Sequence, residues 1–225
     1  MIEFVEKYLK RCQKYSFLFS ELVKRDFKQK YKRTVLGMVW SVLSPLLTLL
    51  VMRLVFTQFF GRNTPYYTTY LFSGNLVMAF YKEATKGGMS SLTGNAKIIS
   101  KINVPKYLFL FSKNISALVN FALTLVVYFI FCAIDGIPFG PHMLALLYPV
   151  LCLTVMNIGV GMVLSAMYVF FRDTRYLYDV FLTLLNYLSA IFYQVDKYPP
   201  QVQRLFLALG CWIYKKKNHE FVYYF

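Results

Sequence analysis

The chain has 225 residues, of which 58% are hydrophobic and only 16% charged, whereas soluble domains are about 45–50% apolar and about 25% charged. The apolar excess lies in blocks that match the roughly 20 residues of helix needed to cross a bilayer, which excludes an ordinary soluble domain. The net charge of +15 lies mainly between these blocks, so it indicates membrane topology and contacts with anionic lipid headgroups rather than nucleic-acid binding.

Residues 1–33 form a basic segment with a helical period. Apolar side chains between Val5 and Phe27 fall near one stripe, and charged ones such as Lys7 and Lys14 lie off it. This pattern predicts an amphipathic helix in the membrane surface. A cytoplasmic helix packed on another protein domain is the alternative, and the two are compatible.

The first span is expected at 35–58, with a kink at Pro45, which lacks a backbone donor and clashes with the preceding turn. Arg53 lies about 27 Å along this helix from its start. That position is close to the far headgroups, where an arginine can snorkel. A buried functional arginine is the alternative.

The second span is expected at 66–81, where Ser73, Gly74 and Asn75 suit packing against other helices. A polar segment with several glycines, 82–106, follows it. Three further spans are expected at 107–134, 143–171 and 176–193, separated by an external turn at 135–141 and a very short return at 172–175.

The distribution of basic residues predicts the orientation. Segments 1–33, 82–106 and 172–175 together hold seventeen Lys and Arg, whereas the short turns on the other side hold only Arg62. Because cytoplasmic loops are enriched in Lys and Arg, the N-terminus is expected in the cytoplasm.

Catalytic motifs are missing from the sequence. It contains no phosphate-binding G-x-x-x-x-G-K-[ST] loop, no G-x-S-x-G, no H-E-x-x-H and no metal-ligand spacing; its only histidines are His142 and His219. We therefore expect no catalytic residue, metal or cofactor on this chain. No ionisable group is expected at the membrane midplane, where ion-coupled transporters usually need one, so a pump built from this chain takes its energy from another subunit.

Four regions resemble one family in the right order, over about residues 20–207. Segment 25–32 (RDFKQKYK), with the nearby strings VLGMVW and SPL, resembles the start of permease subunits of polysaccharide-exporting ABC transporters, which carry O-antigen, capsule or teichoic acid chains. Segments 94–106, 170–176 and 190–200 resemble that family's cytoplasmic loop, its loop between the fourth and fifth spans, and its entry into an external re-entrant hairpin.

The resemblance implies an all-α polytopic permease of the bacterial cytoplasmic membrane that forms a homodimer above two ABC ATPase subunits. ATP would bind to those subunits, and a lipid-linked glycan would pass through a channel between the two permeases. A permease of the same architecture for a drug or small lipid is one alternative. A membrane-embedded enzyme acting on lipid-linked intermediates is another, although no paired carboxylates or histidine cluster converge in this sequence.

The resemblance also implies two interfaces with the ATPase. The first is a coupling loop, for which a basic loop that binds lipid headgroups is the alternative reading; the second is the basic end of the N-terminal segment. The coupling residues are Gly94, Asn95, Ile98, Lys101, Val104 and Pro105, and the N-terminal ones are Arg25, Asp26, Lys28, Tyr31 and Lys32.

Two smaller groups of residues complete the expectations. Arg172, Asp173 and Arg175 form a cytoplasmic turn in which Asp173 can cap the fifth helix, with a direct role in gating as the alternative. Aromatic faces can hold sugar rings, although membrane-interface belts use the same side chains. The candidates for a glycan path are Trp40, Tyr128 and Tyr187.

The C-terminal region departs from the family pattern. A sixth span should follow the hairpin, but the apolar stretch 205–214 is only ten residues, about 15 Å of helix, and Lys215, Lys216 and Lys217 follow it. We expect a truncation or frameshift near Leu209. The expected architecture is thus one permease domain: a cytoplasmic amphipathic segment (1–33), a five-span bundle (35–193), and a hairpin remnant with an atypical tail (194–225).

Overall fold

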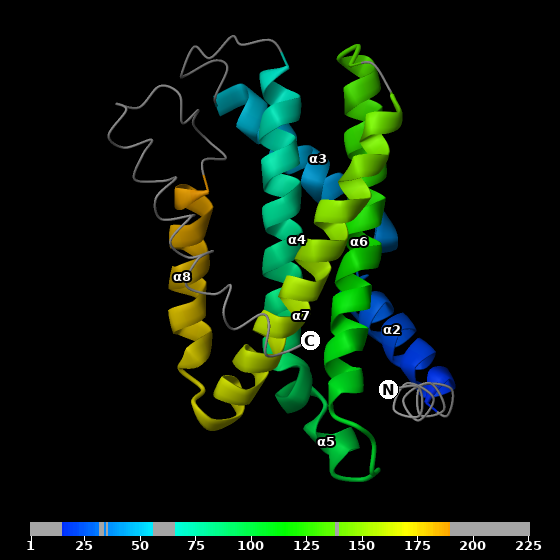
Figure 1. Ribbon diagram of the computed structural model, residues 1–225, viewed down its shortest axis with the longest axis vertical. Coiled ribbons are helices and arrows are strands. Elements are labelled where there is room, and N and C mark those ends of the chain that lie inside the picture. Colours follow the sequence, from blue (N-terminus) through cyan, green and yellow to red (C-terminus); the bar gives the residue numbers. More distant parts are fainter. Residues whose placement is uncertain (1–14, 32–33, 35, 56–65, 138–139, 190–225) are drawn as a thin grey trace. The chain divides into compact units, whose positions relative to one another are not determined.

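The computed structural model describes residues 15–31, 34, 36–55, 66–137 and 140–189, and this part of the chain is helical, with no strand (Figure 1). The chain divides into two compact units, Met1–Leu182 and Thr183–Phe225, and the site discussed below lies in the first. The helices are α2 (Ser16–Tyr31), α3 (Trp40–Arg53), α4 (Tyr67–Gly94), α5 (Ala96–Ile99), α6 (Tyr107–Ile134), α7 (Leu147–Phe170) and α8 (Thr174–Leu188), with short 3-10 turns at Gly37–Val39 and Pro141–Leu146.

Two helical stretches in the described residues are long and apolar enough to cross a membrane, Tyr107–Ile134 and Met143–Phe170. The first has the same bounds as the predicted third span, which is confirmed as a helix. The second agrees with the predicted fourth span, although its first turn is 3-10 and α7 begins at Leu147. Val155 and Val163 on α7 are more than half exposed, as expected of side chains that face lipid.

The other predicted spans are only partly described. Helix α3 has 14 residues, about 21 Å, and it contains Pro45 and ends at the exposed Arg53; residues 56–58 lie outside the described part. Helix α8 covers most of the predicted fifth span. Five spans, the N-terminal orientation and the truncated tail therefore remain predictions, since 1–14 and 190–225 also lie outside the described residues.

The helix of the second predicted span, 66–81, is longer than expected, because it continues into the polar segment 82–106. Helix α4 runs without a break to Gly94 and has 28 residues, about 42 Å. Gly87 and Gly88 looked like loop residues, but Gly88 lies in a close helix crossing: a Cβ added there would lie 2.9 Å from the Cα of Gly161. Small residues let membrane helices approach this closely, so Gly88 allows α4 to pack directly against α7.

Helix α4 is central to the first unit, because it packs against α3, α6 and α7 (Figure 1). Leu76 and Phe80 of α4 form an apolar cluster with Ala117 and Phe121 of α6, and the Phe80 and Phe121 rings lie 4.7 Å apart. This cluster holds α4 and α6 together along the middle of their length.

The end of α6 is closed by a glycine turn. Gly136 has a φ of +74°, and the amides of Gly136 and Ile137 donate to the carbonyls of Ala133 and Cys132. This is the pattern of a Schellman cap, which glycine favours because it tolerates positive φ. Asp135, at the C-cap, accepts a hydrogen bond from Thr69 near the start of α4, so these two helix ends are tied together.

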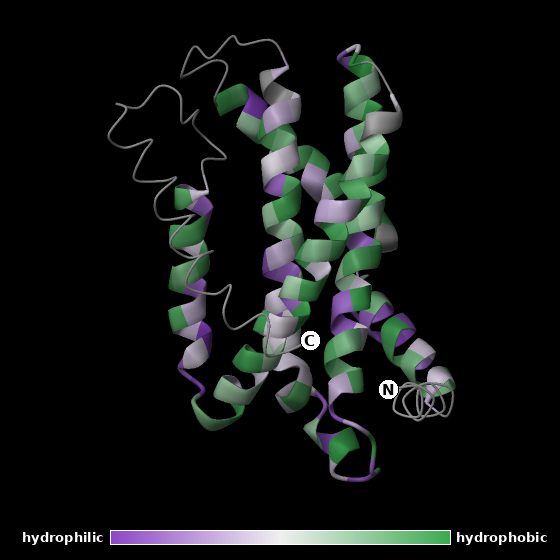
Figure 2. Cartoon of the chain, viewed as in Figure 1, coloured by the Kyte–Doolittle hydropathy of each residue, from purple (hydrophilic) through white to green (hydrophobic). Residues whose placement is uncertain are grey.

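The hydrophilic residues collect at the opposite end of α4 and α6. Figure 2 shows them on α2, around α5 and at the beginning of α6, whereas α6 and α7 are otherwise mainly hydrophobic. Helix α2 packs against α6 there, burying Leu22 and Asp26. The N-terminal helix therefore packs within its own chain, which neither of the two sequence-based interpretations included.

The α4–α7 crossing gives the first prediction. Gly88→Ala should destabilise the protein by about 1–3 kcal/mol, because the new methyl group overpacks the contact with the Gly161 backbone. Gly159→Ala on α7 is the matched control: its Cβ meets nothing within 4 Å, so the gain in helix propensity should leave stability unchanged or slightly raised. Thermal unfolding of both variants in detergent measures the difference, and equal stability of the two would refute the crossing.

Candidate functional site

The Asp26 carboxylate is the centre of a polar cluster at this end of the bundle. Its side chain is only 1% exposed. Oδ1 lies 2.8 Å from Nη2 of Arg25 and 3.0 Å from Nζ of Lys113, and Oδ2 accepts a 3.1 Å hydrogen bond from Ser112. Burying a charge is costly unless it is paired and hydrogen-bonded, and here both oxygens have partners.

Arg25 extends this cluster to the end of α4. Its Nη2 also donates to Oδ1 of Asn95 over 2.7 Å, while Nδ2 of Asn95 donates to the carbonyl of Ser91 over 2.8 Å. Asn95 is buried and lies between α4 and α5. We call Arg25, Asp26, Asn95, Ser112 and Lys113 the Asp26 cluster; it connects α2, the end of α4 and the start of α6.

A second set of polar contacts crosses α4 further along. Lys30 of α2 pairs with Glu83 over 2.8 Å, and Asn120 of α6 donates to the other Glu83 oxygen over 2.9 Å. One turn later Lys86 pairs with Asp179 of α8 over 2.6 Å. Partial burial, and then the nearby charge of Lys86, lower the pKa of Lys82. Within the first unit, α4 is thus tied to three other helices by ion pairs and hydrogen bonds.

The predicted coupling loop is shorter than expected and contains the one-turn helix α5. Asn95 is the only one of its predicted residues that joins the Asp26 cluster; its carbonyl also accepts the amides of Ile98 and Ile99. The residues after Asn95, 96–105, are exposed or half-buried. Their one large exposed apolar side chain is Ile102, 44% exposed. Sequence reasoning missed Ile102. Gly94 and Lys101 are exposed, and Ile98, Val104 and Pro105 are half-buried.

The N-terminal candidates separate into two groups. Arg25 and Asp26 belong to the cluster, whereas Lys28 is exposed. Tyr31 is the last residue of α2, and Lys32 lies outside the described residues. The resemblance pointed to this helix, and in the structure Arg25 and Asp26 help to attach it to the bundle, together with Leu22 and Lys30.

The turn between α7 and α8 has the predicted capping position. Thr174 is the first residue of α8, and the Asp173 carbonyl accepts the amides of Tyr176 and Leu177. The Arg172 guanidinium lies over the Tyr168 ring, 5.3 Å from its centre. Arg172, Asp173 and Arg175 are all exposed, and no side-chain hydrogen bond of Asp173 is found in the described part of the chain. Side-chain capping and the gating alternative therefore both stay predictions.

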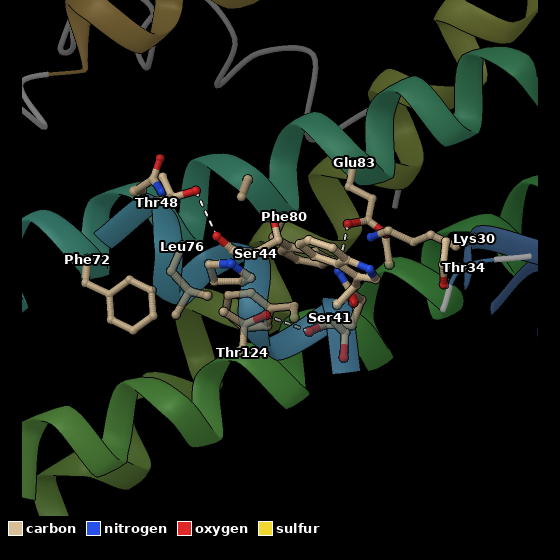
Figure 3. A pocket seen from close by; sticks show the side chains of 17 residues that line it. Lys30, Thr34, Ser41, Ser44, Thr48, Phe72, Leu76, Phe80, Glu83 and Thr124 are labelled. Carbon is tan, nitrogen blue, oxygen red and sulfur yellow. Dashed lines mark hydrogen bonds and ion pairs between the residues drawn. The ribbon is translucent and has the colours of Figure 1, made fainter. Parts of the chain in front are cut away.

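A cavity of about 460 Å³ with both polar and apolar side chains in its lining lies between α3, α4 and α6, and Lys30 of α2 also lines it. Figure 3 shows Lys30 and Glu83 at one end and Phe72 and Leu76 at the other. Trp40 lines this cavity, as do the amide side chains of Asn75 and Asn120. The hydroxyl groups in the lining come from Thr34, Ser41, Ser44, Thr48 and Thr124.

The other two aromatic candidates have different surroundings. Tyr128 packs against Phe72, with ring centres 5.9 Å apart, as part of the helix core. Tyr187 is 65% exposed and belongs to the second unit. Of the three aromatic candidates, Trp40 is the one that lines the cavity described above. Over the described part of the chain, no group of three or more His, Cys, Asp or Glu lies close enough to hold a metal ion.

Comparison with known proteins gives one family and several relatives. The family model described as "ABC-2 type transporter" matches residues 18–210. An "O-antigen export system permease protein RfbA" from Myxococcus xanthus is 26% identical over 96% of this chain and 84% of its own length. A protein of the same name from Klebsiella pneumoniae is 26% identical over 81% of this chain and 72% of its own length. A "Capsule polysaccharide export inner-membrane protein CtrC" from Neisseria meningitidis is 22% identical over 89% and 80%.

The Asp26 cluster gives the second prediction. Asp26→Asn removes the counter-charge of Arg25 and Lys113 and should lower stability by about 1–3 kcal/mol, less than for a fully buried pair because both cations are partly exposed. Glu21→Gln, in an exposed pair with Lys24 on the same helix, should cost no more than about 0.5 kcal/mol. Thermal unfolding of the two variants tests this, and an Asp26→Asn protein as stable as the control would contradict it.

Proposed function

The chain belongs to the ABC-2 type transporter family, and we propose that it is the permease subunit of an ATP-driven exporter that moves a lipid-linked polysaccharide across the bacterial cytoplasmic membrane. The observation that carries this proposal is the agreement of the relatives. Proteins from three organisms, matched over most of both chains, are all named as polysaccharide export permeases. The chain is a transporter subunit rather than an enzyme.

ATP hydrolysis is assigned to a separate ABC ATPase subunit. The 225 residues contain no phosphate-binding loop motif, whereas phosphoryl transfer by such ATPases depends on one. A pair of these permeases, each with its N-terminus in the cytoplasm, would form the membrane part. The cavity with Trp40 supplies hydroxyl, amide and aromatic groups, the chemistry that suits sugar rings, and it is the candidate segment of the glycan path.

The segment from Asn95 to Pro105 is the candidate contact with the ATPase. It lies at the hydrophilic end of the bundle (Figure 2), is largely exposed and presents Ile102. A single exposed apolar side chain is common on protein surfaces, so the proposal rests on the resemblance of this segment to the family's coupling loop and on its place at the hydrophilic end. The segment also lies next to the Asp26 cluster, which it joins through Asn95, and this position supports a role as the ATPase contact.

The Asp26 cluster is the candidate route by which ATPase movement reaches the membrane helices. Asn95 joins the contact segment to Arg25, and Asp26 joins Arg25 to Ser112 and Lys113 on α6. A displacement of α5 would therefore pull on both α2 and α6. Hydrogen-bonded and ion-paired contacts of this kind can carry coupling between two sites.

Deletion of the gene tests the proposed substrate. Lipid-linked polysaccharide should accumulate inside the cell and surface polysaccharide should fall, and a plasmid copy should restore export. Labelled surface glycan and extracted lipid-linked glycan measure both pools. Normal surface glycan in the deletion strain would exclude the export role, and accumulation of a drug or small lipid instead would indicate the other type of permease.

The ATPase contact is tested by Ile102→Glu. A charge at this apolar position should weaken association by about tenfold or more, because the apolar contact is lost and a carboxylate is desolvated. Asn103→Glu places the same charge on the neighbouring exposed residue and should have a smaller effect. Co-purification of an ABC ATPase in mild detergent measures both. An equal loss in the two variants would contradict an apolar contact at Ile102.

A further inference from the structure

A second cavity lies beside the Asp26 cluster, between α2, the end of α4 and the start of α6. Its volume is about 770 Å³. Among the described residues, its lining contains three cationic side chains and no carboxylate. The lining residues are Arg25, Lys28, Gln29, Ser90, Gly94, Asn95 and Lys113.

The positive charge around this cavity exceeds the negative charge. Arg25 and Lys113 share one counter-ion, the buried carboxylate of Asp26. Lys28 is exposed, and no ion pair or hydrogen bond of its ammonium group is found within the described residues. The other nearby carboxylate, Glu83, is bonded to Lys30 and Asn120. Three cations with one carboxylate leave an excess of two positive charges.

The donors of these side chains are suited to a tetrahedral oxyanion. Arg25 uses Nε and Nη2 for Asp26 and Asn95, whereas Nη1 has no acceptor in the described part of the chain. The ammonium groups of Lys28 and Lys113 and the Gln29 amide add further donors. Guanidinium and ammonium groups form strong charge-assisted bonds with phosphate oxygens.

The size of the charge favours phosphate over carboxylate. A phosphomonoester carries about −1.5 to −2 at neutral pH, which matches the excess of two charges. A carboxylate or a phosphodiester carries about −1 and would leave part of the excess uncompensated. The cavity also adjoins α6, which is long and apolar enough to cross the membrane, and α2, whose sequence predicts an interfacial helix.

From these observations we propose that the cavity lined by Arg25, Lys28 and Lys113 binds the terminal phosphate or pyrophosphate group of an anionic lipid. This goes beyond the proposed function, because a lipid phosphomonoester with no polysaccharide attached would occupy the site. With a polysaccharide attached, only a pyrophosphate link would keep the charge of about −2 that the cavity matches, since a monophosphate link becomes a phosphodiester. The competing explanation is a solvated basic surface that attracts any anionic membrane without selecting phosphomonoesters.

Lipid retention by the purified full-length chain tests the proposal. The protein is reconstituted in phosphatidylcholine nanodiscs that contain either phosphatidic acid, a phosphomonoester, or phosphatidylglycerol, a phosphodiester, and native mass spectrometry counts the retained lipid. Phosphatidic acid should be retained about tenfold more than phosphatidylglycerol, the effect of one additional charge-assisted contact. Equal retention of the two lipids would overturn the proposal.

Lys28→Gln identifies the site without disturbing the Asp26 cluster. It should reduce phosphatidic acid retention about tenfold, because one charge-assisted bond is lost, and Lys28→Arg should restore it. Lys24→Gln removes the same charge one turn earlier on α2, where the lysine pairs with Glu21, and should leave retention unchanged. Equal losses in Lys24→Gln and Lys28→Gln, both with the wild-type unfolding temperature, would indicate only a basic surface.

Inorganic pyrophosphate separates a free anion from a lipid as the source of the phosphate. If millimolar pyrophosphate displaces phosphatidic acid from the wild-type chain, the cavity binds the phosphate group without the acyl chains. If it does not, while Lys28→Gln still loses the lipid, the occupant is a lipid held by both headgroup and tails. Neither measurement depends on export, so failure of this site and failure of the proposed function are distinguishable.

Discussion

A buried carboxylate at the end of a membrane helix bundle requires partners, and Asp26 has them on two helices. Arg25 comes from the same helix, and Ser112 and Lys113 come from α6. If α2 moved away, Lys113 would lose its counter-ion, at a cost of about 1–3 kcal/mol because the ammonium group is partly exposed. The ion pair and the burial of Leu22 thus both hold α2 against α6, and the ion pair adds a fixed register between the two helices.

Helix α4 connects this polar end to the rest of the first unit. Its apolar half packs against α6 through Phe80 and Phe121, and its polar half carries Glu83 and Lys86, which pair with other helices. The close crossing at Gly88 lies among these polar contacts. Because α4 is one continuous helix with contacts at both ends, a displacement at Asn95 would act on the other contacts of α4 as well as on its own turn.

The features that the sequence predicted correctly depend on local patterns. A long, mainly apolar run predicted α6 with the bounds that the structure has, and a short polar interruption predicted the turn before α8. The second half of α4 was missed because glycines next to lysines are typical of a loop, whereas the contact of Gly88 with Gly161 involves a residue far along the chain. The contact of Arg25 with Asn95 joins residues 70 positions apart, and no local pattern predicts such a pair. The family resemblance pointed to both residues but not to their contact.

The same arginine belongs to the proposed coupling route and to the proposed phosphate-binding cavity, and this has a thermodynamic consequence. Arg25 donates to Asn95 and Asp26 with Nε and Nη2, while Nη1 remains for a ligand. A headgroup that draws the guanidinium toward the cavity would weaken its bond to Asn95. Conversely, an ATPase that shifts the segment around α5 would move Asn95, and with it the Arg25 guanidinium that would bind the headgroup. Because coupling between two binding equilibria is reciprocal, occupancy of the cavity and the position of α5 must affect each other by the same free energy. A lipid-linked substrate held by a pyrophosphate group would then influence the proposed ATPase contact before any sugar entered the bundle.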